Sequence, residues 1–219
     1  MSTTKIQPYG DRHHAGKMLA EKLHHYHGRP EVLVLALPRG GVPVAVEVAQ
    51  ALEVSLDVFI VRKLGVPGQP ELAFGAVAMG GVRVLNHALV GQLGITEKDV
   101  DAITTIERRE MKRREEIYRS GRPLPKVENQ IVILIDDGLA TGATMMAAVQ
   151  ALRILNPARI VVGVPAASPE TCHQLQSEVD EVVCAITPTP FRSVGSWYED
   201  FAQVTDAEVQ KLLAQVRPS

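Results

Sequence analysis

Short apolar runs alternate along the chain with longer segments in which apolar residues recur at helical spacing. The run Ile131–Ile135 has no polar interruption, which is typical of a strand buried on both faces of a parallel sheet. Further strands are predicted at 32–37, 56–61, 74–78, 82–85, 160–164 and 181–186, and helices at 11–26, 42–52, 96–119, 144–155 and 169–179. This order predicts the α/β class with an open, mainly parallel, doubly wound sheet.

The length of 219 residues and the hydrophobic content of 46% suit one domain with some elaboration, so we interpret 1–219 as a single domain. Thr96 and Asp99 have the spacing of a capping box that starts a charged helix. We expect a helical insertion at 96–120, either simply solvated or serving to shield a site or contact another subunit. Residues 187–219 are expected to form a small hood and a C-terminal helix.

Charge and composition narrow the class of partner and the location. The chain has 23 basic and 25 acidic residues, so no global excess of positive charge favours nucleic acid as a partner. No apolar run approaches the ~20 residues needed to cross a bilayer, so no membrane partner is expected. The polar start MSTTKIQPYGDRHH differs from a signal peptide, and we expect a cytoplasmic protein.

The cysteines and histidines give no sign of a metal site. Cys172 and Cys184 lie in a predicted helix and a predicted strand without metal-ligand spacing, so we expect reduced, structural thiols. The five N-terminal histidines do not have the i, i+4 spacing of a helical metal pair, and no cysteine or acid completes a ligand set. They are His13, His14, His24, His25 and His27.

The segment that follows Ile131–Ile135 carries the clearest chemistry. Asp136 and Asp137 stand where the predicted strand ends, and the small-residue loop 138–144 leads directly into a helix. Backbone N–H groups at such a helix start can close around an anion. Two carboxylates beside a phosphate cradle suit a sugar phosphate, whose hydroxyls and phosphate need both, whereas a turn made only for packing explains neither the acids nor the threonines.

Two common phosphate motifs do not fit this loop. Ala143 stands where a Walker loop needs lysine, and the spacing of Gly138 and Gly142 differs from that of a dinucleotide fingerprint.

The stretch IVILIDDGLATGAT resembles the phosphoribosyl-pyrophosphate-binding motif of type I phosphoribosyltransferases, which is a long and specific pattern. The resemblance implies that Asp136 and Asp137 bind the ribose hydroxyls. It also implies that the loop residues Ala140, Thr141, Gly142, Ala143 and Thr144 bind the 5-phosphate.

The segment Pro38-Arg39-Gly40-Gly41 forms a second candidate anion site after the first predicted strand. Its glycine pair exposes backbone amides ahead of a helix, although a simple turn would explain the same residues. The resemblance implies that Arg39, Gly40 and Gly41 form the pyrophosphate loop.

A third candidate element runs from Val61 to Glu71. Lys63 and Arg62 end a predicted strand, and glycines and prolines follow them, so we expect a loop that closes over the site as a lid. The resemblance implies that Lys63, and next Arg62, contact pyrophosphate. Solvent-facing cations at a strand end are the alternative.

The aromatic residues near the C-terminus follow the last predicted strand. The resemblance implies that this segment is a hood that stacks the acceptor base, with Phe191 as the stacking candidate and Trp197 and Tyr198 behind it. An apolar cluster under a loop is the alternative.

The expected activity is transfer of a 5-phosphoribosyl group from phosphoribosyl pyrophosphate, with Mg²⁺ held by the substrate and by Asp136 and Asp137 directly or through water. Ala140 replaces the aspartate of 6-oxopurine transferases and disfavours such an acceptor. The text LATGAT is closer to adenine transferases, in which an acid such as Glu71 serves, but the PRGG loop departs from that type. A uracil or other non-purine acceptor therefore stays open.

Two other functions are considered. A regulator with the same fold could sense phosphoribosyl pyrophosphate or a nucleotide without turnover. A diphosphokinase-like synthetase would need an ATP site and a longer chain.

Overall fold

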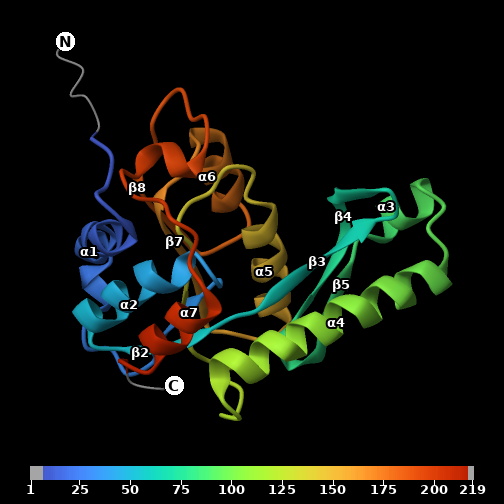
Figure 1. Cartoon of the computed structure of the whole chain (residues 1–219), viewed down its shortest axis with the longest axis horizontal. Helices are drawn as coiled ribbons and strands as arrows, with labels where there is room; N and C mark the ends of the chain where they lie inside the picture. Colours follow the sequence, from blue (N-terminus) through green and yellow to red (C-terminus); the bar gives the residue numbers. More distant parts are fainter. Residues whose placement is uncertain (1–6, 217–219) are drawn as a thin grey trace.

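A parallel sheet of five strands forms the centre of the molecule (Figure 1). The computed structural model describes residues 7–216, apart from the side chains of Pro70 and Glu71. The strand order is β2 (Ser55–Val58), β1 (Val32–Ala36), β6 (Ile131–Ile135), β7 (Arg159–Ala166) and β8 (Glu181–Ile186). All five residues of β6 are buried, which confirms the prediction of a central strand covered on both faces.

Helices cover both faces of this sheet, as the doubly wound prediction requires. Helices α1 (Arg12–Lys22) and α2 (Gly41–Leu52) lie on one face, and α5 (Ala143–Ile154) and α6 (Pro169–Gln176) lie on the other (Figure 1). The chain moves from β1 outward to β2, and from β6 outward to β7 and β8 in the opposite direction. The strand order thus reverses between β1 and β6, where ligands bind in sheets of this kind.

A second, antiparallel sheet projects from this core with the order β3 (Val61–Val66), β4 (Gln69–Ala78) and β5 (Val82–Leu85). The predicted strand 56–61 is therefore divided between two sheets. The predicted lid loop at 61–71 is also wrong, because these residues form a hairpin. Its proline and glycine lie in the tight turn at Pro67 and Gly68, where Gly68 has a φ of +79°.

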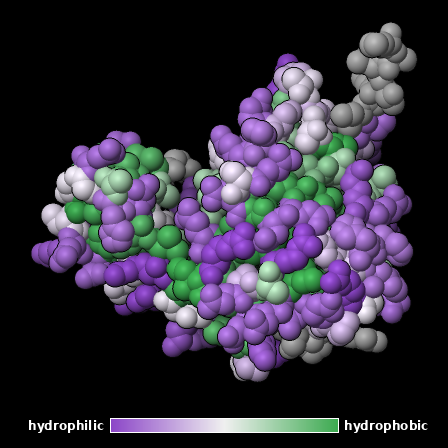
Figure 2. All heavy atoms as spheres, turned by 180° about the vertical axis from the view of Figure 1, so that it is seen from behind, coloured by the Kyte–Doolittle hydropathy of each residue, from purple (hydrophilic) through white to green (hydrophobic). Residues whose placement is uncertain are grey.

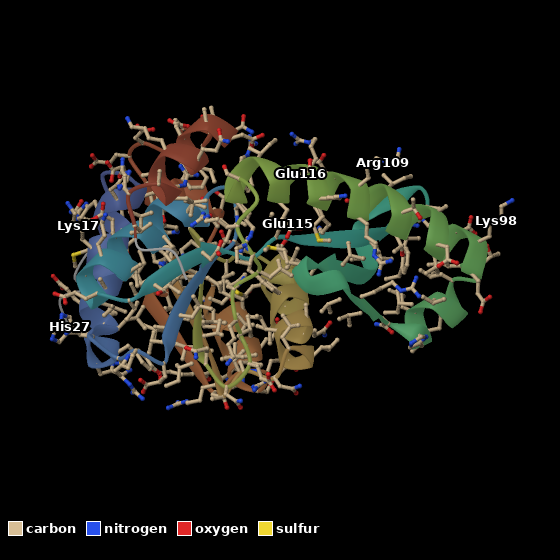
Figure 3. All side chains as sticks on the ribbon, turned by 90° about the horizontal axis from the view of Figure 1, so that it is seen from below. Lys17, His27, Lys98, Arg109, Glu115 and Glu116 are labelled. Carbon is tan, nitrogen blue, oxygen red and sulfur yellow. A yellow bond between two sulfur atoms is a disulfide. The ribbon has the colours of Figure 1, made fainter. Side chains whose placement is uncertain are left out.

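Two helices complete the projecting lobe, α3 (His87–Gln92) and the long α4 (Glu97–Arg119). Thr96 and Asp99 form the predicted capping box, which is confirmed. On the inward face of α4, Val100, Met111 and Tyr118 are buried and Ile103 is partly buried. In Figure 3, Lys98, Arg109 and Glu116 of α4 point away from the body of the molecule.

Cys172 in α6 and Cys184 in β8 form a disulfide, so the expectation of reduced thiols is wrong. Their Cα atoms are 6.9 Å apart because α6 packs beside the strand that follows it. The spacing of 12 residues carries no sign of this pairing, which depends on how the helix lies on the sheet.

The rear face of the molecule is mostly hydrophilic, with apolar atoms showing where the lobe meets the core (Figure 2). At this junction Phe59, Met79, Leu124 and Leu155 line a cavity of about 420 Å³. Within residues 7–216, no helix combines the length and the apolar character needed to cross a membrane.

Candidate functional site

The two predicted anion loops meet at the point where the strand order reverses. The Leu37 amide donates to the Ile135 carbonyl at 2.8 Å, which places the Arg39–Gly41 loop beside the end of β6. A Cβ atom at Gly40 would overlap the Asp137 carboxylate, and one at Gly41 would lie 2.7 Å from the Ile135 carbonyl oxygen. Only glycine allows this approach, so the close contact of the loops depends on both residues.

Asp136 and Asp137 form a half-buried acidic pair at the end of β6. The Asp137 amide donates to Oδ1 of Asp136 at 2.9 Å. Burial and the neighbouring Asp137 raise the pKa of Asp136 well above its usual value. Burial also raises the pKa of Asp137, while a hydrogen bond from Arg12 opposes the change. Such a pair is best satisfied by hydroxyl groups or a cation.

A divalent cation at this pair would need ligands from a bound molecule. Within the described residues, no group of three or more histidine, cysteine, aspartate or glutamate side chains could hold a metal ion. Two adjacent carboxylates nevertheless suit Mg²⁺, which prefers oxygen ligands and is often bound by one or two carboxylates together with substrate phosphates.

The loop after the acidic pair leads into α5 and is held in place by α6. Gly142 is the N-cap of α5 with a φ of +69° and no capping side chain, so the first-turn N–H groups remain available to an anion. The Thr171 hydroxyl donates to the Ala140 carbonyl at 2.6 Å, and the Leu139 amide donates to the carbonyl of Ala166 at 2.9 Å. Of the predicted phosphate-binding residues, Ala140, Thr141, Ala143 and Thr144 are exposed and Gly142 is half-buried.

The predicted pyrophosphate loop lies next to the C-terminal helix α7 (Asp206–Leu213). The peptide bond between Pro38 and Arg39 is cis. Arg39 Nη1 lies 3.8 Å from Oδ1 of Asp206, which also accepts a hydrogen bond of 2.6 Å from the Tyr118 hydroxyl. The guanidinium of Arg39 is thus directed toward the start of α7 and the end of α4.

The three residues predicted on the lid lie on the antiparallel hairpin. Arg62 Nε donates to Oε2 of Glu107 in α4 at 2.7 Å, so the structure turns Arg62 toward α4 and not toward the acidic pair. Lys63 is the next residue of β3, is half-buried, and projects from the opposite side of the hairpin. Glu71 lies in β4, and its side chain is outside the described part of the structure.

The hood packs against the acidic pair from the side of β7. Tyr198 is 6% exposed, and its hydroxyl donates to the Asp137 backbone carbonyl at 2.5 Å. Phe191 and Trp197 are partly buried against the apolar cluster that contains Tyr198. Phe201 lies next to Tyr198 with a ring-centroid separation of 5.0 Å and is 36% exposed. Of the predicted stacking residues, Tyr198 is therefore a buried support of the Asp137 backbone.

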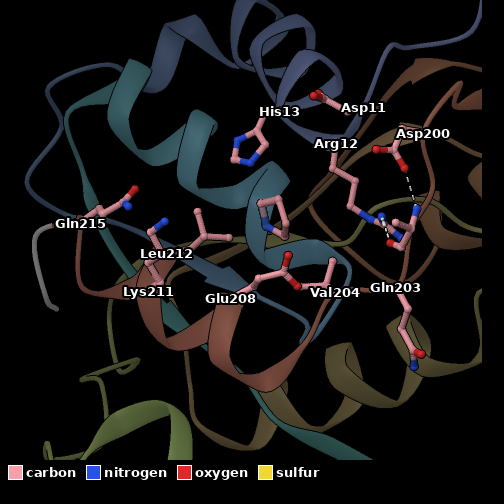
Figure 4. Close-up of a pocket in the computed structure, with 12 residues that line it drawn as sticks. Asp11, Arg12, His13, Asp200, Gln203, Val204, Glu208, Lys211, Leu212 and Gln215 are labelled. Carbon is pink, nitrogen blue, oxygen red and sulfur yellow. Dashed lines mark hydrogen bonds between the residues drawn. The ribbon is translucent and has the colours of Figure 1, made fainter.

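Sequence reasoning missed Arg12, which is the ionic partner of the acidic pair. Arg12 Nε donates to Oδ2 of Asp137 at 2.8 Å. Figure 4 shows the second contact of Arg12, in which Nη1 donates to the Ala202 carbonyl at 2.8 Å. Asp137 is 125 residues away in the chain, and no local pattern connects the two. The only local sign is Asp11, which caps the helix that Arg12 begins.

A cavity of about 450 Å³ adjoins Arg12, between the start of α1, helix α2 and helix α7 (Figure 4). Its volume is in the range of small-molecule pockets.

Comparison with known proteins agrees with this geometry. Residues 3–196 match the phosphoribosyl transferase domain family. Proteins of two strains of Mycobacterium tuberculosis, each named "Putative phosphoribosyl transferase", are 44% identical to this chain over 205 residues, which is 94% of this chain and 46% of theirs. The chain thus spans about half the length of these curated relatives.

A solved structure is similar over nearly the whole of both chains. The crystal structure of TT1426 from Thermus thermophilus has a TM-score of 0.85 and 42% sequence identity, covering 96% of this chain and 99% of that one. The doubly wound fold, the paired loops and the match over residues 3–196 lead to one conclusion: this chain belongs to the phosphoribosyltransferase domain family.

Proposed function

We propose that this chain binds phosphoribosyl pyrophosphate with Mg²⁺ and transfers the 5-phosphoribosyl group to a nitrogen of a nucleobase or related acceptor, releasing pyrophosphate. The observation that supports this most directly is the meeting of the 39–41 loop with Asp136 and Asp137, next to the loop braced by Thr171. Two anion loops around two carboxylates match a ligand with phosphates at both ends and hydroxyls between them.

In this reaction the bond between C1 and the pyrophosphate oxygen breaks, and its electron pair leaves with pyrophosphate. A lone pair of the acceptor nitrogen forms the new bond to C1, and that nitrogen loses its proton. Backbone amides of Gly40 and Gly41, with Arg39 and Lys63, are proposed to stabilise the charge on the leaving group. Arg62 could contribute only after exchanging its contact with Glu107.

The rest of the site would bind and orient the sugar. Asp136 and Asp137 would accept hydrogen bonds from the ribose hydroxyls, and residues 140–144 would bind the 5-phosphate through backbone amides and hydroxyls. When bound, Mg²⁺ would supply charge neutralisation of the diphosphate.

The acceptor is proposed to bind under the hood. Phe191 and Trp197 remain the proposed stacking residues, with Tyr198 supporting them, and the Glu71 carboxylate is proposed as the base that takes the proton from the acceptor nitrogen. Ala140 leaves no carboxylate at the position where 6-oxopurine transferases carry one, so we propose an acceptor of another kind.

A non-catalytic sensor would bind the same donor without turnover, and a mass-spectrometric screen separates the two functions. The purified protein is incubated with Mg²⁺, phosphoribosyl pyrophosphate and a panel of nucleobases and related amines. We expect one phosphoribosylated product together with pyrophosphate. If the protein binds the donor but forms a product with none of the acceptors in the panel, the sensor is favoured instead.

The donor site is tested by replacing both aspartates, Asp136→Asn with Asp137→Asn. We expect Mg²⁺-dependent binding of phosphoribosyl pyrophosphate, measured by calorimetry, to weaken at least about 10-fold because charged hydrogen bonds of ~1.5–3 kcal/mol are lost. Asp101→Asn is the control, since that carboxylate is 74% exposed on the distal lobe. Unchanged binding in the double variant would contradict the proposal.

A further inference from the structure

We propose that Arg12 is a positioning residue of this site, which fixes the Asp137 carboxylate and at the same time fastens the hood to the N-terminal helix. The inference rests on the proposed function, in which Asp137 binds the ribose. It concerns a residue outside both loops, at the start of α1.

The Asp137 carboxylate is tightly confined. The side chains of Arg12 and Asp137 are only 11% and 15% exposed, and a charge-assisted hydrogen bond of 2.8 Å joins Nε to Oδ2. The same oxygen lies so close to Gly40 that no Cβ would fit there. Asp137 is thus confined both by an arginine and by the proposed pyrophosphate loop.

Arg12 is itself held in place at both ends of its side chain. Arg12 is the first residue of α1, and the preceding Asp11 caps that helix by accepting a hydrogen bond from the His14 amide. The guanidinium carbon lies 3.9 Å from the centroid of the Phe201 ring. A side chain anchored at its base and packed at its tip can set the position of its partner.

Arg12 also connects Asp137 to the hood. Arg12 Nη1 donates to the Ala202 carbonyl at 2.8 Å (Figure 4). Two backbone hydrogen bonds join the same two segments. The Tyr9 amide donates to the Trp197 carbonyl at 2.9 Å, and the Glu199 amide donates to the Tyr9 carbonyl at 2.8 Å. Residues 9–12 and 197–202 therefore form one unit, and Arg12 joins that unit to Asp137.

A lysine cannot reproduce these contacts. Arginine presents separate N–H groups to Asp137 and Ala202, whereas lysine has one ammonium group. Arg12→Lys should keep a positive charge near Asp137 and lose the simultaneous contact with the hood. The two roles can therefore be separated by experiment.

The test compares Arg12→Gln and Arg12→Lys with Arg29→Gln, a control arginine that is 41% exposed and pairs with Glu31. Calorimetry measures binding of phosphoribosyl pyrophosphate with Mg²⁺, and hydrogen exchange of residues 197–202 is measured without ligand. Arg12→Gln should weaken binding about 10- to 100-fold and speed exchange in the hood. Arg12→Lys should recover part of the affinity but not the protection, and Arg29→Gln should change neither.

Arg12→Gln with affinity within about twofold of wild type and unchanged exchange would overturn the inference. Should the wild-type protein bind no phosphoribosyl pyrophosphate, the proposed function fails, and a crystal structure of Arg12→Gln decides the inference. An unmoved Asp137 side chain and hood would then overturn it, and a displaced one would support it. If Arg12→Gln does not fold, the same affinity and exchange criteria apply to Arg12→Lys.

Discussion

Glycine residues decide how closely the parts of this site approach one another. Gly40 and Gly41 allow the proposed pyrophosphate loop to lie against the acidic pair. At Gly138, a Cβ atom would lie 2.5 Å from a methyl carbon of Val194 and 2.9 Å from the Ala166 carbonyl oxygen. A methyl group at any of these positions would force the two sides of the site apart.

Gly40→Ala tests this close approach. The added methyl group overlaps the Asp137 carboxylate, so we expect binding of phosphoribosyl pyrophosphate to weaken by at least about 10-fold, which corresponds to overpacking of ~1–3 kcal/mol. Calorimetry measures the binding, and thermal unfolding shows that the fold persists. Gly91→Ala is the matched control, because a Cβ there has no atom within 4 Å. Equal affinity in both variants would contradict the argument.

Among the elements, α4 is a charged helix that carries ion pairs between its own side chains. Hydrogen bonds from Arg113 and Arg114, both 2.8 Å long, reach the Glu110 carboxylate. These hydrogen bonds lower the pKa of Glu110 from 4.5 to about 2.

The lowered pKa predicts how the pair depends on pH. A carboxylate whose pKa falls on folding stabilises the protein fully above its unfolded value, and this contribution is lost as pH falls from about 4.5 through about 2. Glu110→Gln should lower the free energy of unfolding by only about 0.2–1 kcal/mol near neutral pH, since the pair is partly solvated. Urea unfolding across this range should show the difference vanishing in acid. The exposed Glu116→Gln serves as control, and a pH-independent difference would contradict the assignment.

The element that braces the phosphate loop is α6, which the disulfide fastens to β8. Cys172 directly follows Thr171, whose hydroxyl holds the Ala140 carbonyl at 2.6 Å. The cross-link therefore stabilises the helix on which the loop rests.

Removal of the disulfide should reduce stability. Cys172→Ser with Cys184→Ser is expected to lower the free energy of unfolding by about 2–4 kcal/mol, because the unfolded chain is no longer constrained. Denaturant unfolding with and without reductant measures this, and reductant should affect the wild type but not the double variant. Two free thiols in wild-type protein prepared without reductant would contradict the prediction.

At the scale of the whole molecule, a buried ion pair joins the projecting lobe to the core. Arg119 at the end of α4 contacts Asp57 of β2, and their side chains are 1% and 2% exposed. An uncompensated charge at this depth is strongly unfavourable, so each partner depends on the other.

Replacing one partner of this pair should destabilise the protein more than expected from the effect of replacing both partners together. Arg119→Met is expected to lower the free energy of unfolding by about 3–5 kcal/mol because it removes the buried cation that contacts the Asp57 carboxylate. Asp57→Asn combined with Arg119→Met should lose less than the sum of the single variants. Chemical denaturation of the full cycle measures the coupling, with the half-buried Arg122→Met as control. Additive losses would contradict the argument.

Two expectations about the whole protein stay predictions: a cytoplasmic location and assembly into an oligomer. The disulfide between Cys172 and Cys184 does not favour a cytoplasmic location, because such bonds are uncommon in reducing compartments.

The order of residues along the chain was enough to predict the α/β class, the central position of Ile131–Ile135, the start of α4 at Thr96 and the family. Each of these depends on a contiguous pattern: an apolar run, a capping box, or an acidic pair followed by a small-residue loop. Such patterns are local, because the spacing of apolar residues and the capping side chains can be read from consecutive positions in the chain.

Three features became visible only in the folded chain: residues 61–71 form a hairpin, Cys172 pairs with Cys184, and Arg12 holds Asp137. These features depend on segments distant in sequence, or on how a helix lies across a strand. A glycine and a proline indicate a turn but not the strands on either side of it. The acidic pair was visible in the sequence, whereas the arginine that positions it lies 125 residues earlier in the chain and reaches the pair only in the folded protein.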